Sequence, residues 1–133
     1  MLYYLKLYAS TFAAFFLIDM IWLGFVARTF YRQQIGFLLT ERPNWTAAFA
    51  FYFLFVAGLL VFVIVPSIGT GSLRKAILLG AFFGLVTYAT YDLTNLATVA
   101  KWPIAVTIVD MLWGATLAAA VSICGFYAGR WLQ

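Results

Sequence analysis

Three aspartates are the residues of this chain whose type and position could do chemistry. Asp19, Asp92 and Asp110 each interrupt an apolar stretch, and Glu41 is the only other acidic residue. A carboxylate inside a membrane span is costly, so it persists mainly where it faces a protein interior, a water-filled cavity or a partner. Carboxylates in such places bind protons, cations or the amine of a ligand, and we expect the functional site here.

The composition is that of an integral membrane protein. Of 133 residues, 66% are hydrophobic, 20% are aromatic and 9% are charged, whereas soluble domains carry about a quarter charged residues. The absence of His excludes haem ligation by imidazole, typical zinc sites and catalysis by a His base. We therefore expect no haem or zinc cofactor, while a bound cation would suit the acids. The lone Cys124 cannot close an intramolecular disulfide.

The basic residues are placed as anchors at the ends of apolar segments. The net charge is +4, but Lys and Arg occur singly or in pairs, which suits lipid headgroups and argues against nucleic acid as a partner. Four lie on the side of the termini and four on the other side: Lys6, Arg74, Lys75 and Arg130 against Arg28, Arg32, Arg42 and Lys101. The positive-inside rule therefore gives no orientation, and a dual topology stays open.

Four apolar segments are long enough to cross a bilayer, which takes about 20 residues each. The expected spans are residues 2–27, 45–65, 76–97 and 103–127, with an interfacial segment at 28–39. Pro43 lies in the break before the second span, and Pro66 and the glycines after it are turn signals. The fold class is all-α, a polytopic four-transmembrane-helix bundle that forms a single membrane domain over residues 1–133.

The three aspartates are expected at one depth, because the first and third loops lie on the same side of the membrane. Asp19 precedes Arg28 by nine residues, Asp92 precedes Lys101 by nine, and Asp110 follows Lys101 by nine. At 1.5 Å per residue, each carboxylate lies about 13 Å below that face.

Helical spacing predicts that two of the acids face each other. Two rows of small residues end at them: Ala76, Gly80, Gly84, Tyr88 and Asp92, and Asp110, Gly114, Ala118 and Ser122. Small residues let membrane helices approach closely, and a short connection makes the third and fourth helices antiparallel neighbours. Two carboxylates in a low dielectric cannot both be ionised cheaply, so Asp92 and Asp110 should share a proton or hold a cation. Asn95 and Thr107 could complete an oxygen-rich ring around it, and any metal would be held by the two aspartates.

Asp19 has aromatic surroundings. It shares its helix face with Phe12, Phe15, Phe16 and Trp22. Its local sequence, DMIW, recurs around the third acid as DMLW, which ends at Trp113. We expect Asp19 and Trp22 to form a third wall of the site, and a sandwiching pair of Trp22 and Trp113 is compatible with the repeat.

Two other interpretations remain open. The spans could end at the acids, over residues 76–91 and 111–128, which would place Asp92 and Asp110 among headgroups; residues 22–27 and 104–106 would then be apolar residues stranded there. The acids could also be structural and bond across helices to Tyr88, Tyr91, Thr94 or Thr107. The spacing of acids within one helix that lipid phosphotransferases use for magnesium is missing.

The chain also resembles a known family. The segments that carry the resemblance are FFLIDMIWLG (15–24), YDLTNLAT (91–98) and WPIAVTIVDMLWG (102–114). They are similar to the predicted bacterial membrane proteins grouped under domain of unknown function 2177, over essentially the whole chain. The resemblance implies a small multi-pass protein of the bacterial inner membrane and assigns no catalytic or binding residue.

We expect proton- or cation-linked binding or transport of a small or amphiphilic solute. Its site would comprise Asp19, Asp92, Asp110, Asn95, Thr107, Tyr88, Trp22 and Trp113. The alternatives are a lipid-modifying membrane enzyme that uses the aspartates as acid, base or magnesium ligands, and a non-catalytic accessory subunit. The bilayer and further copies of the chain are the expected partners, with a small molecule or lipid as ligand. The lack of a catalytic motif weighs against an enzyme.

Overall fold

The computed structural model describes all 133 residues, and 84% of them are helical. The elements in chain order are α1 (Leu2–Ile21), the π-helical turn η1 (Trp22–Val26), α2 (Arg28–Ile35), α3 (Trp45–Leu59), the π-helical turn η2 (Leu60–Ile64), α4 (Val65–Gly69), α5 (Leu73–Thr98) and α6 (Ile104–Trp131). Four continuous helical stretches are long and apolar enough to span a membrane: Leu2–Val26, Trp45–Gly69, Leu73–Thr98 and Ile104–Trp131. The prediction of an all-α chain with four spans is confirmed.

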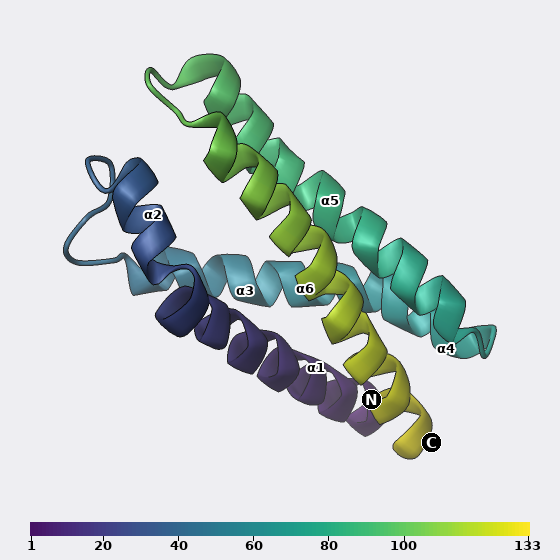
Figure 1. The fold of residues 1–133 in the computed structure, drawn as a ribbon. Coiled ribbons are helices and arrows are strands. Elements are labelled where there is room, and N and C mark those ends of the chain that lie inside the picture. Colours follow the sequence, from purple (N-terminus) through teal and green to yellow (C-terminus); the bar gives the residue numbers. More distant parts are fainter.

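Helix α6 lies at the centre of the bundle. It packs against α5 along most of its length and against α1 on its other side, while α3 packs on α1. The close backbone contacts between the second span and α5 lie in η2 and α4, so the N-terminal part of α3 diverges from α5 (Figure 1). Both chain termini lie at one end of the bundle, and the loops that follow α2 and α5 lie at the other (Figure 1).

The helix boundaries follow local signals. The Asn44 side chain caps α3 by accepting from the Ala47 N–H at 3.1 Å, and Ser72 caps α5 in the same way through the Lys75 N–H. The expected end of the second span at Val65 differs from the structure, because the helix continues through Pro66 to Gly69. Proline has no N–H and clashes with the carbonyl of the preceding turn, and the helix accommodates it with the wider turn η2.

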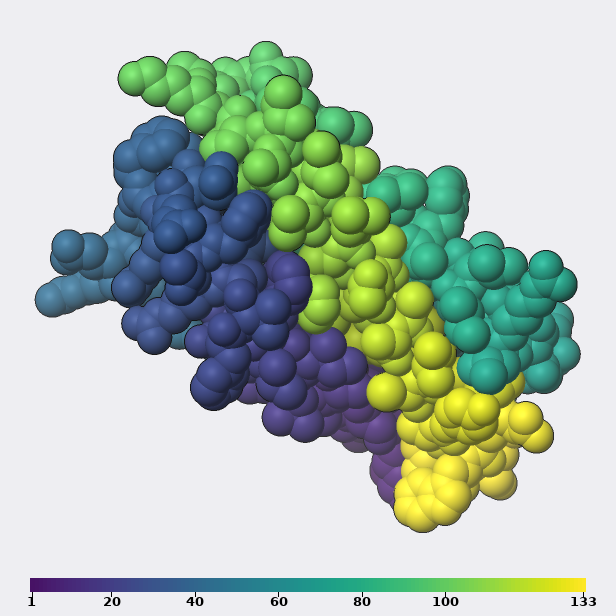
Figure 2. Space-filling model, viewed as in Figure 1, coloured from purple at the N-terminus to yellow at the C-terminus, as the bar shows by residue number.

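A π-helical turn redirects the chain at the end of the first span. The Ala27 N–H bonds to the Trp22 carbonyl oxygen at 2.8 Å, five residues back, which is the pattern of a π-bulge. Helix α2 then lies against the N-terminal part of α6 (Figure 2), where Ile35 packs with Trp102 and Val106. The first part of the predicted interfacial segment, Arg28–Ile35, is therefore a helix that bends away from α1 and lies against α6.

Close contact between α5 and α6 follows the predicted rows of small residues. Gly84 and Gly114 are buried and face each other. A Cβ at Gly84 would run into the Gly114 carbonyl oxygen and would lie 2.6 Å from the Ala118 Cβ. Only glycine, which has no Cβ, fits at this position. Both helices continue beyond the acids, which lie within α5 and α6 rather than at their ends.

Candidate functional site

Asp92 and Asp110 meet between α5 and α6. Asp92 is fully buried and Asp110 is 8% exposed. Their side chains lie within hydrogen-bonding reach of each other, yet no N–H or O–H group of the protein donates to either carboxylate oxygen of Asp92. A buried carboxylate without a donor is unfavourable unless a proton or a cation accompanies it. The pair therefore has the geometry to hold one of these.

Tyr31 connects α2 to this pair. Its hydroxyl donates to the Asp110 Oδ1 and accepts from the Trp22 Nε1 at 3.2 Å. Partial burial, together with the hydrogen bond to Asp110, raises the pKa of the Tyr31 phenol above its ordinary value. Tyr31 thus stays protonated at physiological pH and acts as a donor to the carboxylate.

Asp19 is connected to Tyr31 through the stacked pair of Trp22 and Trp113. Its Oδ1 accepts from the Trp113 Nε1 at 3.3 Å, and the Tyr52 hydroxyl lies beside it. The rings of Trp22 and Trp113 stack with centroids 4.2 Å apart and planes inclined by 6°. The two indole N–H groups therefore donate to different residues of the site: Trp22 to the Tyr31 hydroxyl and Trp113 to Asp19. The tryptophans that end the two copies of the local repeat, DMIW and DMLW, thus stack on each other.

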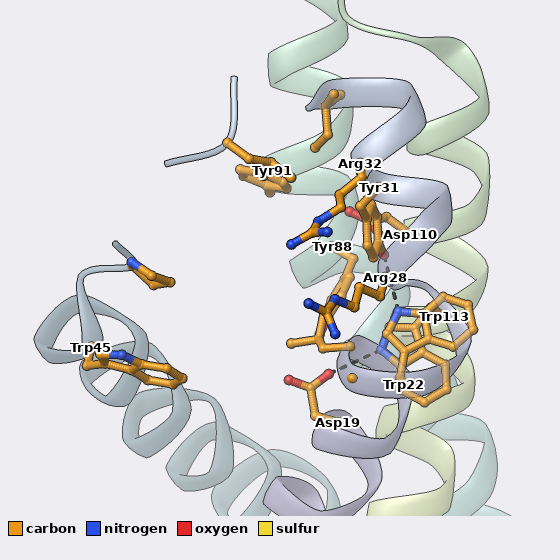
Figure 3. Close-up of a pocket in the computed structure, with 15 residues that line it drawn as sticks. Asp19, Trp22, Arg28, Tyr31, Arg32, Trp45, Tyr88, Tyr91, Asp110 and Trp113 are labelled. Atoms are coloured by element: carbon orange, nitrogen blue, oxygen red, sulfur yellow. Dashed lines mark hydrogen bonds between the residues drawn. The ribbon is translucent and has the colours of Figure 1, made fainter. Parts of the chain in front are cut away.

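A cavity of about 750 Å³ opens in front of these groups. Asp19 and Asp110 line it from α1 and α6, and Arg28 and Arg32 line it from α2. Figure 3 shows the two guanidinium groups one helical turn apart, projecting into the space that faces Trp45 of α3. The remaining polar lining comes from Tyr31, Tyr88 and Tyr91 with the stacked tryptophans. We refer to this space as the aspartate cavity; it combines two cationic, two acidic and several aromatic side chains.

Two of the predicted site residues do not join the acids. The Thr107 hydroxyl accepts from the Trp102 Nε1 at 3.1 Å and donates to the backbone oxygen of Asp92 at 3.4 Å. Asn95 lies beside the Tyr91 hydroxyl. The expected oxygen-rich ring is not formed, because Thr107 bonds to the Trp102 side chain and to the backbone of α5, and Asn95 lies beside Tyr91 of its own helix. No three acidic or other metal-ligating side chains converge.

The structure also adds residues that the sequence interpretation left out of the site. Arg28, Arg32 and Tyr31 fall in the segment that was expected at the membrane interface, and Trp45 was not assigned to the site. The signal that could have found the first three is their spacing, since positions 28, 31 and 32 share one face of a helix. No local signal shows that this face turns towards α6, because the direction of α2 depends on the π-helical turn before it.

The comparisons with known proteins agree with this architecture. No curated protein and no solved structure matches the chain. One family matches over residues 4–127, and it is described as "Predicted membrane protein (DUF2177)". Because this match covers nearly the whole chain, and because four of the helices are suited to crossing a bilayer, the protein is a multi-pass integral membrane protein that belongs to the DUF2177 family.

Proposed function

We propose that the protein binds, or moves across the membrane, a small or amphiphilic solute in the aspartate cavity, and that binding is linked to a proton or cation on Asp92 and Asp110. The observation that carries the proposal is the buried Asp92 carboxylate, to which no protein group donates. Asp110 is its only acidic neighbour and lines the cavity. A change in the charge of the Asp92–Asp110 pair therefore changes the electrostatic potential in the cavity where a ligand would bind.

The linkage follows from electrostatics in a low dielectric. A ligand amine that approaches Asp110 stabilises the carboxylate form of this residue. The pair of Asp92 and Asp110 then releases its proton more readily. Conversely, a proton bound by the pair weakens the attraction for the amine. Ligand and proton thus exclude each other, and the affinity for a cationic solute should rise with pH, by at most about tenfold per pH unit if one proton is exchanged.

Dodecylammonium and dodecanol are suitable probes because they share a tail and differ in the amine. We expect dodecylammonium to raise the unfolding temperature of the purified protein more strongly in mildly alkaline than in mildly acidic buffer, and dodecanol to show no such pH dependence. Asp92→Asn and Asp110→Asn should remove the pH dependence. Glu41→Gln is the matched control, since Glu41 is exposed and lies outside the cavity.

The protonated state of the pair has its own spectroscopic test. A protonated carboxyl gives an infrared C=O stretch that is separate from the bands of carboxylates and the backbone. We expect this band in the wild type, its loss in Asp92→Asn, and its decrease when dodecylammonium binds. If the aspartate variants keep the wild-type pH dependence of binding, the proposal is refuted.

Bacterial inner-membrane localisation and homo-oligomerisation are part of the same proposal. Four apolar helices and the family resemblance support the first, and membrane fractionation tests it. The large apolar residues exposed on the outer faces of the helices support the second, although lipid covers such surfaces equally well. Light scattering of the protein in detergent, corrected for the micelle, measures the number of copies.

A further inference from the structure

A groove extends from the aspartate cavity between α3 and α5. An apolar cavity of about 440 Å³ is lined by Phe51, Val61 and Phe62 of the second span and by Phe83 of α5, among others. A smaller cavity of about 390 Å³ lies next to both the apolar cavity and the aspartate cavity. It shares two lining residues with the apolar cavity, Phe51 and Thr87, and three with the aspartate cavity, Tyr88, Tyr91 and Asp110. We call the three together the α3–α5 groove.

The groove exists because the backbone of the second span comes close to α5 only at η2 and α4, while farther towards its N-terminus only side chains such as Phe55, against Phe83 and Tyr88, reach across. The N-terminal part of α3 diverges from α5 (Figure 1). From Phe51 to Phe62 the groove follows 11 residues, which is about 16 Å along a helix. This direction leads away from the interfacial helix α2 and towards the middle of the membrane.

The charges at the entrance of the groove are arranged in two sets. Arg28 and Arg32 project from α2 into the aspartate cavity, and Figure 3 shows no hydrogen bond from either guanidinium to the other cavity residues. Guanidinium groups bind phosphate through charge-assisted hydrogen bonds. The carboxyl groups of Asp19 and Asp110 line the same cavity from α1 and α6, and they suit an amine. The cavity thus complements a head that carries a phosphate and an ammonium group together.

We propose that the α3–α5 groove binds an aminophospholipid of the bilayer, with its phosphate on Arg28 and Arg32, its ammonium group at Asp19 and Asp110, and one acyl chain between Phe51 and Phe62. The ammonium contact rests on the proposed function, because it uses the same carboxylate. The phosphate and acyl-chain contacts are independent of it. The polar entrance at the level of α2 and the apolar continuation below match the order of head and chain in a bilayer lipid.

The head contacts are tested by native mass spectrometry of the purified protein with added phospholipids. Phosphatidylethanolamine, phosphatidylglycerol and phosphatidylcholine with identical acyl chains are compared. We expect phosphatidylethanolamine to be retained most. Arg28→Gln combined with Arg32→Gln should weaken its binding about thirtyfold, given the usual contribution of two basic side chains to lipid binding. Lys6→Gln combined with Arg74→Gln removes the same charge from exposed positions at the other end of the bundle and should have no effect.

The chain contact is tested with phosphatidylethanolamine that carries a photoactivatable diazirine in one acyl chain. Cross-links should concentrate on residues 51–62 and on Phe83. Ala57→Trp fills the apolar cavity that Ala57 lines and should reduce this labelling. Ala13→Trp is the matched control on the exposed face of α1 and should leave it unchanged. Size-exclusion chromatography and circular dichroism of each variant establish that it is folded.

The outcomes separate this inference from the proposed function. Wild-type retention of phospholipid by the Arg28 and Arg32 double variant would overturn the phosphate site. Uniform labelling around the bundle, or a second copy of the chain cross-linked into the groove, would overturn the lipid groove. Equal retention of phosphatidylethanolamine and phosphatidylglycerol would overturn the ammonium contact. If the arginine effect persists while the Asp92→Asn variant keeps its pH dependence, the lipid site holds and the proton linkage fails.

Discussion

The packing of α5 on α6 at Gly84 leads to a quantitative prediction about the acid pair. In Gly84→Ala, the new Cβ meets the Gly114 carbonyl oxygen and lies 2.6 Å from the Ala118 Cβ, so the backbones must separate. Overpacking of this kind costs about 1–3 kcal/mol. Alanine favours the helix over glycine by about 1 kcal/mol, and the mid-range overpacking cost of about 2 kcal/mol therefore leaves a net loss of about 1 kcal/mol.

The free energy of unfolding in mixed micelles measures this loss, with sodium dodecyl sulfate as denaturant and circular dichroism as the signal. Gly69→Ala is the control, because a Cβ there meets nothing within 4 Å; its stability should match the wild type within about 0.5 kcal/mol. Asp92 lies two turns along the same face of α5 from Gly84. Gly84→Ala should therefore also diminish the pH dependence of dodecylammonium binding.

A wild-type unfolding free energy for Gly84→Ala would refute the reasoning. It would mean that α5 and α6 are not in backbone contact at Gly84, and the meeting of Asp92 with Asp110 would lose its structural basis. A destabilised variant with unchanged pH dependence would be informative in a different way. It would show that the packing of α5 on α6 at Gly84 stabilises the bundle but does not determine how the Asp92 and Asp110 carboxyl groups are oriented.

Three further predictions concern the hydrogen bonds and rings around the acids. Tyr31→Phe should cost about 1 kcal/mol of stability in the same unfolding assay. Titration of the phenol itself should add no pH dependence to this loss below the ordinary phenol pKa of about 10, because burial and Asp110 raise the pKa of Tyr31 in the folded protein. Trp113→Phe should abolish the exciton couplet that the stacked Trp22 ring contributes to the circular dichroism spectrum; a couplet that persists would contradict the stack. Thr107→Val should destabilise the protein by about 0.6–1 kcal/mol without changing the pH dependence of binding, since its hydroxyl bonds to backbone rather than carboxylate.

The long α5–α6 contact could be anticipated because its signals are local. Gly80, Gly84 and Asp92 fall on one helix face by spacing alone, and a short connection makes antiparallel packing of the two helices the simplest arrangement. The ring of Asn95 and Thr107 could not be excluded in this way. Whether a side chain bonds to a carboxylate or to nearby backbone depends on rotamers and on neighbours such as Trp102, which spacing does not reveal.

The sequence by itself determined the four apolar spans and the rows of small residues that lead to Asp92 and Asp110, because composition and helical period act over a few turns. Only the tertiary structure decided that α2 packs beside α6, so that Arg28 and Arg32 line the aspartate cavity and Tyr31 reaches Asp110, 79 residues away in the chain. It also decided that α3 diverges from α5. Such placements depend on the packing of all the helices together, on a π-helical turn at Trp22, and on contacts between residues far apart in the chain.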